Sequence, residues 1–144
     1  MALRTAERTL SPVDVALRVG IVGLALATGY IHSTLGGLLF TLNAVGYVAF
    51  AIAMIVPISL AVQYRWLVRL MLIGYALTTI VGWAIQGPYY STAYVAKAIE
   101  VALIFLVAVD FLRADGNPVK VVKREVKATL AKISRRPTEG VTAA

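Results

Sequence analysis

The sequence predicts an all-α integral membrane protein, a four-helix bundle of four transmembrane helices with both termini cytoplasmic and a C-terminal cytoplasmic amphipathic helix. Three observations predict it: long runs without charge, an apolar composition, and an uneven distribution of Lys and Arg. Hydrophobic residues make up 60% of the 144 residues, more than the roughly 45–50% typical of soluble globular domains. Lipid is therefore expected to cover much of the surface.

Two segments contain no Asp, Glu, Lys or Arg: Val19 to Tyr64 and Leu70 to Ala96. A bilayer core about 30 Å thick needs roughly 20 helical residues per crossing. The first segment is long enough for two crossings with a turn between them, and the second supplies a third. We place the four spans at about residues 11–31, 35–60, 66–86 and 92–112.

Local signals support these boundaries. Ser11, Pro12 and Asp14 form a capping-box pattern with proline at the first helical position, so the first span is expected to begin there. Pro57 comes near the end of the second span, where a missing backbone donor costs least. Gly87-Pro88 ends the third span. The bundle at residues 11–113 is then a single domain between an N-terminal cytoplasmic segment (1–10), a basic juxtamembrane helix (114–137) and a disordered tail (138–144).

A secretory signal remains the alternative for the first span. Arg4, Arg8 and Arg18 precede its apolar part, and Ala25-Leu26-Ala27 has the small-x-small form of a cleavage site.

Lys and Arg predict the orientation, because positively charged segments resist translocation. The loops at about 31–35 and 86–94 carry none of them. Basic residues occur instead at the N-terminus (Arg4, Arg8), in the middle linker (Arg65, Arg69) and in the tail from Arg113 onward. A multi-pass protein of the inner or plasma membrane with both termini cytoplasmic is expected, which agrees with an even number of spans.

The tail is predicted to form a basic amphipathic helix, with Val119, Val122, Val126, Leu130 and Ile133 recurring at steps of three and four. Cations at the membrane surface attract anionic headgroups by about 1 kcal/mol each. A half-apolar helix next to a membrane is unlike a nucleic-acid-binding arm, and we expect no nucleic acid partner. The residues predicted to contact anionic lipid are Lys120, Lys123, Arg124, Lys127, Lys132, Arg135 and Arg136.

Small residues spaced by four predict the faces on which the spans pack. Ala25 and Gly29 mark the first span, and Gly74, Thr78 and Gly82 mark the third. The bundle itself or a homo-oligomer is the partner of these faces, and the oligomeric state stays open.

One set of polar residues is a candidate site. Lys97 and Glu100 lie roughly 8 and 12 Å into the fourth span at 1.5 Å per residue, and their spacing of three permits pairing. A carboxylate there costs on the order of 2.5–3.5 kcal/mol, so it needs a partner and faces the bundle or a wet cavity. His32, Asn43 and Gln86 are expected at similar height.

A structural explanation of the same residues also remains open. Lys97 then extends its ammonium group to the headgroups, Glu100 serves only to pair with it, and His32 is a loop histidine at the interface. At the cytoplasmic boundary, Asp14 with Arg18, Asp110 with Arg113, and Arg69 with Asp110 are expected as ion pairs on the same grounds.

The composition excludes several chemistries. The chain has no cysteine and one histidine, which excludes disulfides, iron–sulfur clusters and a zinc site of normal composition. No nucleotide-binding or metalloprotease motif is present. We assign no catalytic residue, no metal and no cofactor.

The function is therefore predicted only by class. A non-enzymatic accessory or assembly subunit of a membrane complex is the first hypothesis. The alternative is a small transporter, channel or lipophilic-ligand protein with an outward-facing polar site around Glu100. An enzyme acting on a lipid or quinone near His32 is a third hypothesis.

Overall fold

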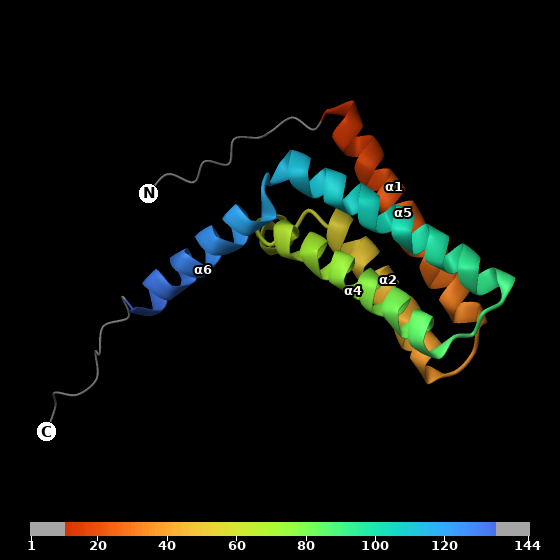
Figure 1. Cartoon of the computed structure of the whole chain (residues 1–144). Helices are drawn as coiled ribbons and strands as arrows, with labels where there is room; N and C mark the ends of the chain where they lie inside the picture. Colours follow the sequence, from red (N-terminus) through yellow and green to blue (C-terminus); the bar gives the residue numbers. More distant parts are fainter. Residues whose placement is uncertain (1–10, 135–144) are drawn as a thin grey trace, which may run out of the picture.

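The computed structural model describes residues 11–134, and this range contains α-helices and no strand (Figure 1). The helices are α1 (Pro12–Thr34), α2 (Leu38–Ile55), α3 (Ser59–Gln63), α4 (Arg65–Gln86), α5 (Ser91–Ala114) and α6 (Pro118–Ser134). Three of these, α1, α2 and α4, are long and apolar enough to cross a membrane. Helix α5 has 24 residues, but Lys97, Glu100 and Asp110 interrupt its apolar sequence.

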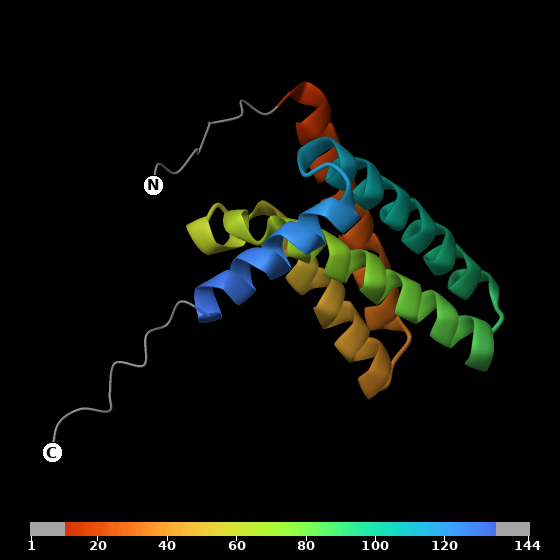
Figure 2. The same cartoon turned by 60° about the vertical axis from the view of Figure 1, so that its left-hand side comes forward.

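The four long helices pack in a closed order. Helix α1 lies along α2 and α5, and α4 lies along α5 and α2. Figures 1 and 2 show the α1–α2 and α4–α5 connections at one end of this assembly, with the start of α1 and the end of α5 at the other. We call these the loop end (residues 34–38 and 86–91) and the tail end (residues 11–14, 55–65 and 113–118).

The start of α1 is formed as the sequence predicts. The Asp14 backbone N–H donates to Ser11 Oγ at 3.2 Å, and the Ser11 N–H donates to Asp14 Oδ2 at 3.1 Å. This reciprocal capping box satisfies two donors that a helix start leaves free. Helix α1 then continues to Thr34, beyond the predicted end near residue 31, so His32 lies in its last turn and not in a loop.

The second span ends earlier than predicted. Helix α2 stops at Ile55, and Val56 is extended with φ −61° and ψ 124°. Pro57 explains both observations, because the proline ring disfavours helical geometry in the preceding residue and proline has no N–H to donate. Residues 56–58 are not helical, and the last two residues of the predicted span, Ser59 and Leu60, begin the separate short helix α3.

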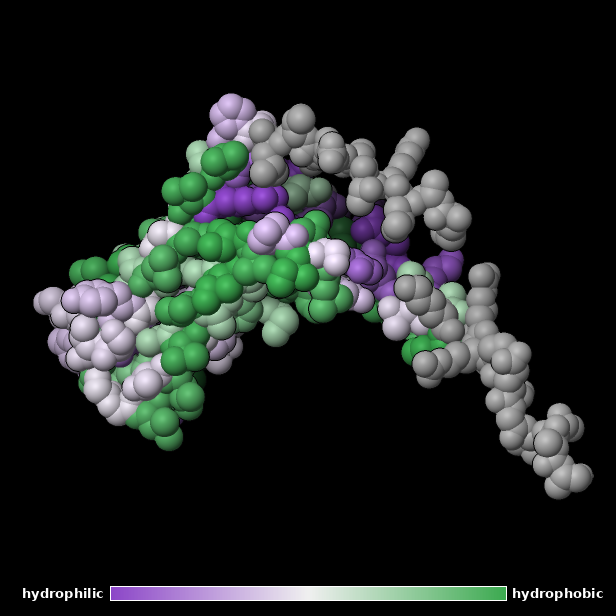
Figure 3. Space-filling model, turned by 180° about the vertical axis from the view of Figure 1, so that it is seen from behind, coloured by the Kyte–Doolittle hydropathy of each residue, from purple (hydrophilic) through white to green (hydrophobic). Residues whose placement is uncertain are grey.

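One apolar cluster at the centre holds the long helices together. Its buried members are Ile21, Ala25, Tyr47, Ala51, Met54, Leu72, Ala76, Leu103 and Val107. Many large apolar side chains also point outward, including Leu38, Ile85 and Phe105 at 75%, 73% and 68% exposure. Figure 3 shows a broad hydrophobic surface over the helices, with hydrophilic residues gathered near the tail end. Such an extensive apolar surface is typical of contact with lipid.

The small-residue faces are only partly used within the chain. Gly29 on α1 is buried and faces α2, where a Cβ would make ordinary contact with the Ala44 carbonyl oxygen at 3.4 Å. Gly74 and Gly82 have open space around them, and Thr78 is exposed. Of the two partners expected for this face of α4, the bundle itself is therefore ruled out within the described residues, because α4 turns other residues toward its neighbours, and a homo-oligomer stays open.

Helix α6 extends from the tail end and makes no extended contact with another helix in the described range (Figures 1 and 2). Asn117 Oδ1 caps it by accepting from the Val119 N–H at 2.9 Å. The predicted apolar stripe is exposed, and the buried residue is Val121 at 3% exposure, which the stripe did not include. The Lys132 side chain and residues Arg135 and Arg136 lie outside the described part of the chain.

We predict that Gly46→Ala lowers the melting temperature of the purified protein by several degrees. A Cβ at Gly46 would lie 2.6 Å from Tyr75 Cζ, and overpacking of this kind typically costs about 1–3 kcal/mol. Thermal unfolding in detergent measures the effect.

Gly74→Ala is the matched control, since open space surrounds Gly74 in α4. Alanine in a helix is favoured over glycine by about 0.5–1 kcal/mol, so this variant should be neutral or slightly more stable. Equal destabilisation by both changes would contradict the packing described for Gly46.

Candidate functional site

Glu100 on α5 is fully buried, with 0% exposure, and donors from three helices surround its carboxylate. Lys97 Nζ donates to Oε2 at 2.7 Å, and Thr79 Oγ1 on α4 donates to the same oxygen at 2.9 Å. Thr28 Oγ1 on α1 donates to Oε1 at 3.3 Å. A buried carboxylate is tolerated when its charge and its hydrogen bonds are both matched, and this arrangement supplies both.

His32 faces the other side of the Glu100 carboxylate. Its Nε2 lies 3.7 Å from Glu100 Oε1, and its Nδ1 lies 2.8 Å from the Thr28 carbonyl oxygen. A carbonyl oxygen only accepts hydrogen bonds, so Nδ1 carries a hydrogen. Nε2 is then the ring nitrogen that faces Glu100 Oε1.

Hydroxyl groups extend the polar cluster into the bundle. The Tyr47 hydroxyl lies 3.0 Å from Thr79 Oγ1. The single Thr79 hydroxyl hydrogen is shared between two acceptors, Glu100 Oε2 at 2.9 Å and the Ala76 carbonyl oxygen at 2.8 Å, so Tyr47 acts as the donor of this further contact. Lys97 Nζ also donates to the Thr79 carbonyl oxygen at 3.3 Å. The chain Tyr47–Thr79–Glu100 thus connects the carboxylate to the central core.

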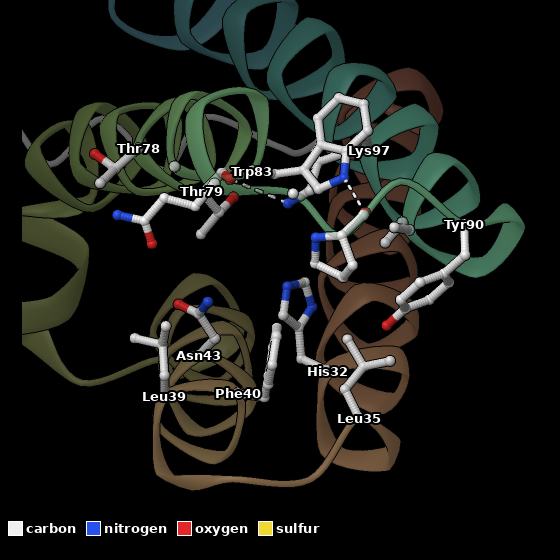
Figure 4. Close-up of a pocket in the computed structure, with 16 residues that line it drawn as sticks. His32, Leu35, Leu39, Phe40, Asn43, Thr78, Thr79, Trp83, Tyr90 and Lys97 are labelled. Carbon is white, nitrogen blue, oxygen red and sulfur yellow. Dashed lines mark hydrogen bonds between the residues drawn. The ribbon is translucent and has the colours of Figure 1, made fainter.

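A cavity of about 260 Å³ opens at the loop end, directly beside this cluster. Figure 4 shows His32 and Asn43 pointing into it, with Trp83 and Lys97 on the opposite wall. The polar lining is His32, Asn43, Thr78, Thr79, Gln86 and Lys97. The larger apolar and aromatic lining is Leu35, Leu39, Phe40, Gly82, Trp83, Gly87, Pro88, Tyr90, Ala93 and Ala96. Small pockets with mostly apolar walls and few polar groups are typical of sites for small organic ligands.

The structure brings the predicted polar residues together. Lys97, Glu100 and His32 form one contact cluster, and Asn43 and Gln86 line the adjacent cavity. His32 is 3% exposed and belongs to α1, so the reading of it as an exposed loop residue is wrong. Whether the set has a function stays a prediction.

Sequence reasoning missed Thr28 and Thr79, and it expected the Tyr47 hydroxyl to donate to a backbone carbonyl, whereas this hydroxyl contacts Thr79 Oγ1. A signal for Thr28 was available, because it precedes His32 by four residues and therefore lies on the same helix face. Hydroxyls are common in membrane helices and usually bond to the backbone of their own turn. Only the packing of α1 and α4 against α5 shows that Thr28 and Thr79 reach the carboxylate.

The ion pairs at the tail end differ from those predicted within single helices. Asp14 pairs with Arg113 at 3.2 Å, and not with Arg18. Arg69 Nε donates to Asp110 Oδ2 at 2.7 Å, as expected, and its Nη1 donates to Asp115 Oδ2 at 2.8 Å. The difference arises because residues on neighbouring helices face each other more directly than residues one turn apart.

Asp115 lies just beyond the end of α5. Partial burial raises the pKa of its carboxyl above the usual value, although the nearby charge of Arg69 opposes that shift. Among residues 11–134, no group of three or more His, Asp or Glu side chains is placed to hold a metal ion.

Comparisons with protein-family models, with characterised proteins and with solved structures find no match to this chain. The fold and the buried polar cluster therefore define the class by themselves: an all-α protein with three helices apolar enough to cross a membrane and a buried, neutralised carboxylate beside a cavity.

We predict that Lys97→Met lowers the free energy of unfolding by about 3–5 kcal/mol near neutral pH, because it leaves the buried Glu100 carboxylate without its counter-charge. The double variant Lys97→Met/Glu100→Gln should recover most of this loss. A double-mutant cycle of unfolding free energies in detergent measures the coupling.

Lys123→Met is the control for this experiment, because Lys123 is exposed on α6. It should change the stability by less than about 0.5 kcal/mol. Additive effects of the Lys97 and Glu100 changes would contradict the pairing.

Proposed function

We propose that the protein is a four-span membrane protein of the cell membrane that binds a small lipophilic ligand with a polar head in the cavity at its loop end. One observation carries the proposal: a fully buried carboxylate, paired with Lys97 and faced by Nε2 of His32, lies next to a largely apolar cavity.

A purely structural role does not account for the whole arrangement. A buried Lys–Glu pair is often no more stable than well-packed apolar residues of similar volume. Packing also requires neither a histidine facing the carboxylate nor a cavity lined by Phe40, Trp83 and Tyr90. Ionisable groups inside membrane helices commonly mark ligand or proton sites, and these additional features support that interpretation here.

The cavity lining also supports the class of ligand. Aromatic and aliphatic side chains form most of the wall, so an apolar body is accommodated by burial of its surface. His32, Asn43 and Gln86 offer donors and acceptors for a hydroxyl, carbonyl or carboxyl head. The cavity of about 260 Å³ limits the ligand to a small molecule.

We further propose that α1, α2, α4 and α5 all cross the membrane, with the loop end outside and the tail end in the cytoplasm. The basic residues support this orientation, because Arg65, Arg69, Arg113 and the lysines of α6 gather at the tail end. Helix α5 crosses because its Lys97–Glu100 and Asp110–Arg69 contacts neutralise the ionisable groups that it carries.

Single-cysteine labelling tests the topology, because the chain has no cysteine of its own. Ser33→Cys at the loop end should react with a membrane-impermeant maleimide on intact cells. Lys123→Cys on α6 should react only after permeabilisation, and both positions are exposed in the structure. Labelling of the two cysteines from the same side of the membrane would contradict the proposed topology.

Quenching of Trp83 fluorescence tests the ligand site, because Trp83 lines the cavity. We use the Trp66→Phe background, which leaves Trp83 as the single tryptophan, and the probes bromo-octanol and bromo-octanoic acid. Saturable quenching is expected. Glu100→Gln in this background should change the half-saturating concentration, because it removes the carboxylate that Lys97 and His32 face.

The Trp83→Phe protein is the matched control, since it retains Trp66 at the tail end and reports only partitioning of the probe into the micelle. Ala96→Leu reduces the cavity volume and should weaken quenching of Trp83. Equal, unsaturable quenching of Trp83 and Trp66 would contradict the ligand site.

An accessory or assembly subunit is the second candidate function. Helix α6 supports it, because its apolar residues Val119, Val126 and Leu130 are exposed and the helix extends away from the bundle. Membrane lipid or a partner subunit would cover them, and anionic headgroups would contact Lys120, Lys123, Arg124 and Lys127. The absence of saturable Trp83 quenching, together with a membrane protein that co-purifies only when α6 is intact, would favour this candidate.

A further inference from the structure

The tail end contains three arginines whose charges are not fully balanced. Arg18 on α1 and Arg69 on α4 lie close enough to Arg65, at the start of α4, to repel its charge, and the carboxylates of Asp110 and Asp115 attract it. Arg65 and Arg69 are 9% and 2% exposed. Buried cations require anionic partners.

Arg69 forms ion pairs with two carboxylates, Asp110 near the end of α5 and Asp115 just beyond it. Its Nε donates to Asp110 and its Nη1 donates to Asp115. The other described carboxylates also have basic partners: Asp14 pairs with Arg113, Glu100 with Lys97 and Glu125 with Arg124. Within residues 11–134, no carboxylate is paired with Arg18 or Arg65.

Arg18 and Arg65 retain free donors. Arg65 Nη2 donates to the Val56 carbonyl oxygen at 3.1 Å. The Nε atoms of Arg18 and Arg65 are both buried and have no hydrogen-bond partner in the described part of the chain. Buried polar groups in native proteins are nearly always hydrogen-bonded, so two unpartnered guanidinium nitrogens at one end of the bundle indicate a missing acceptor.

A phosphate group has the geometry and the charge to accept hydrogen bonds from these two guanidinium groups. A guanidinium presents Nε–H and Nη–H as a planar fork, which matches two oxygens of a phosphate. Helix α4 begins at Arg65, so the positive end of its dipole adds to the attraction. We propose that Arg18 and Arg65 bind one phosphate group, supplied by an anionic lipid headgroup or by a soluble phosphate. This site lies at the opposite end from the cavity and does not depend on the ligand proposed there.

Thermal unfolding of the full chain in neutral maltoside micelles tests the proposal. At constant ionic strength, phosphatidylglycerol, phosphatidylcholine and sodium phosphate are titrated separately. Phosphatidylglycerol should raise the melting temperature saturably, whereas phosphatidylcholine should not. Arg18→Lys and Arg65→Lys should each raise the half-saturating concentration about tenfold or more, because lysine keeps the charge but loses the fork. A similar rise with sodium phosphate identifies a soluble phosphate, and a rise with the lipid alone identifies a headgroup.

The double variant Lys120→Gln/Lys123→Gln is the control for diffuse attraction by α6. It should retain the effect of phosphatidylglycerol. The proposal is overturned if this variant loses the effect while the two arginine variants keep it, or if no probe raises the melting temperature.

Native mass spectrometry of the wild type supplies a second measurement that needs no variant. One phosphatidylglycerol or one phosphate retained per chain is expected after mild delipidation. Its absence under conditions that preserve the fold would overturn the proposal, even if the arginine variants failed to fold.

Discussion

The neutralisation of Glu100 constrains how the long helices pack. A carboxylate inside the bundle is stable only while Lys97, Thr79 and Thr28 stay in contact with it. These three side chains come from α5, α4 and α1, so the same interactions fix the relative position of three helices. Because apolar contacts do not by themselves favour one helix arrangement in lipid, a polar cluster of this kind specifies the arrangement more strongly than leucine packing does.

The two ends of the molecule differ in their balance of charge. At the loop end, the charges of Lys97 and Glu100 cancel. At the tail end, Arg69 pairs with both Asp110 and Asp115, and basic residues remain in excess. An excess of basic residues at one end is the pattern from which the positive-inside rule predicts orientation in a membrane.

How much of this structure the sequence predicts depends on how far apart along the chain the interacting residues lie. The capping box of Ser11 and Asp14 and the Lys97–Glu100 pair depend on neighbours within one turn, and both are present. The end of α2 at Ile55 also has a local cause, Pro57. The apolar sequence continues past this proline, and for that reason the helix was expected to extend to residue 60. The pairing of Asp14 with Arg113 depends on residues far apart in the sequence, which spacing along one helix does not predict.

The candidate site illustrates the same distinction. Depth along each span predicts that His32, Lys97 and Glu100 lie at similar height, because helical rise is constant. Rotation about the helix axis decides whether they face each other, and small differences in packing set that rotation. The hydrogen bond from His32 Nδ1 to the Thr28 carbonyl shows why this matters. It fixes which ring nitrogen faces Glu100, so the geometry of the site depends on an interaction within one turn of α1 and on the packing of α1 against α5.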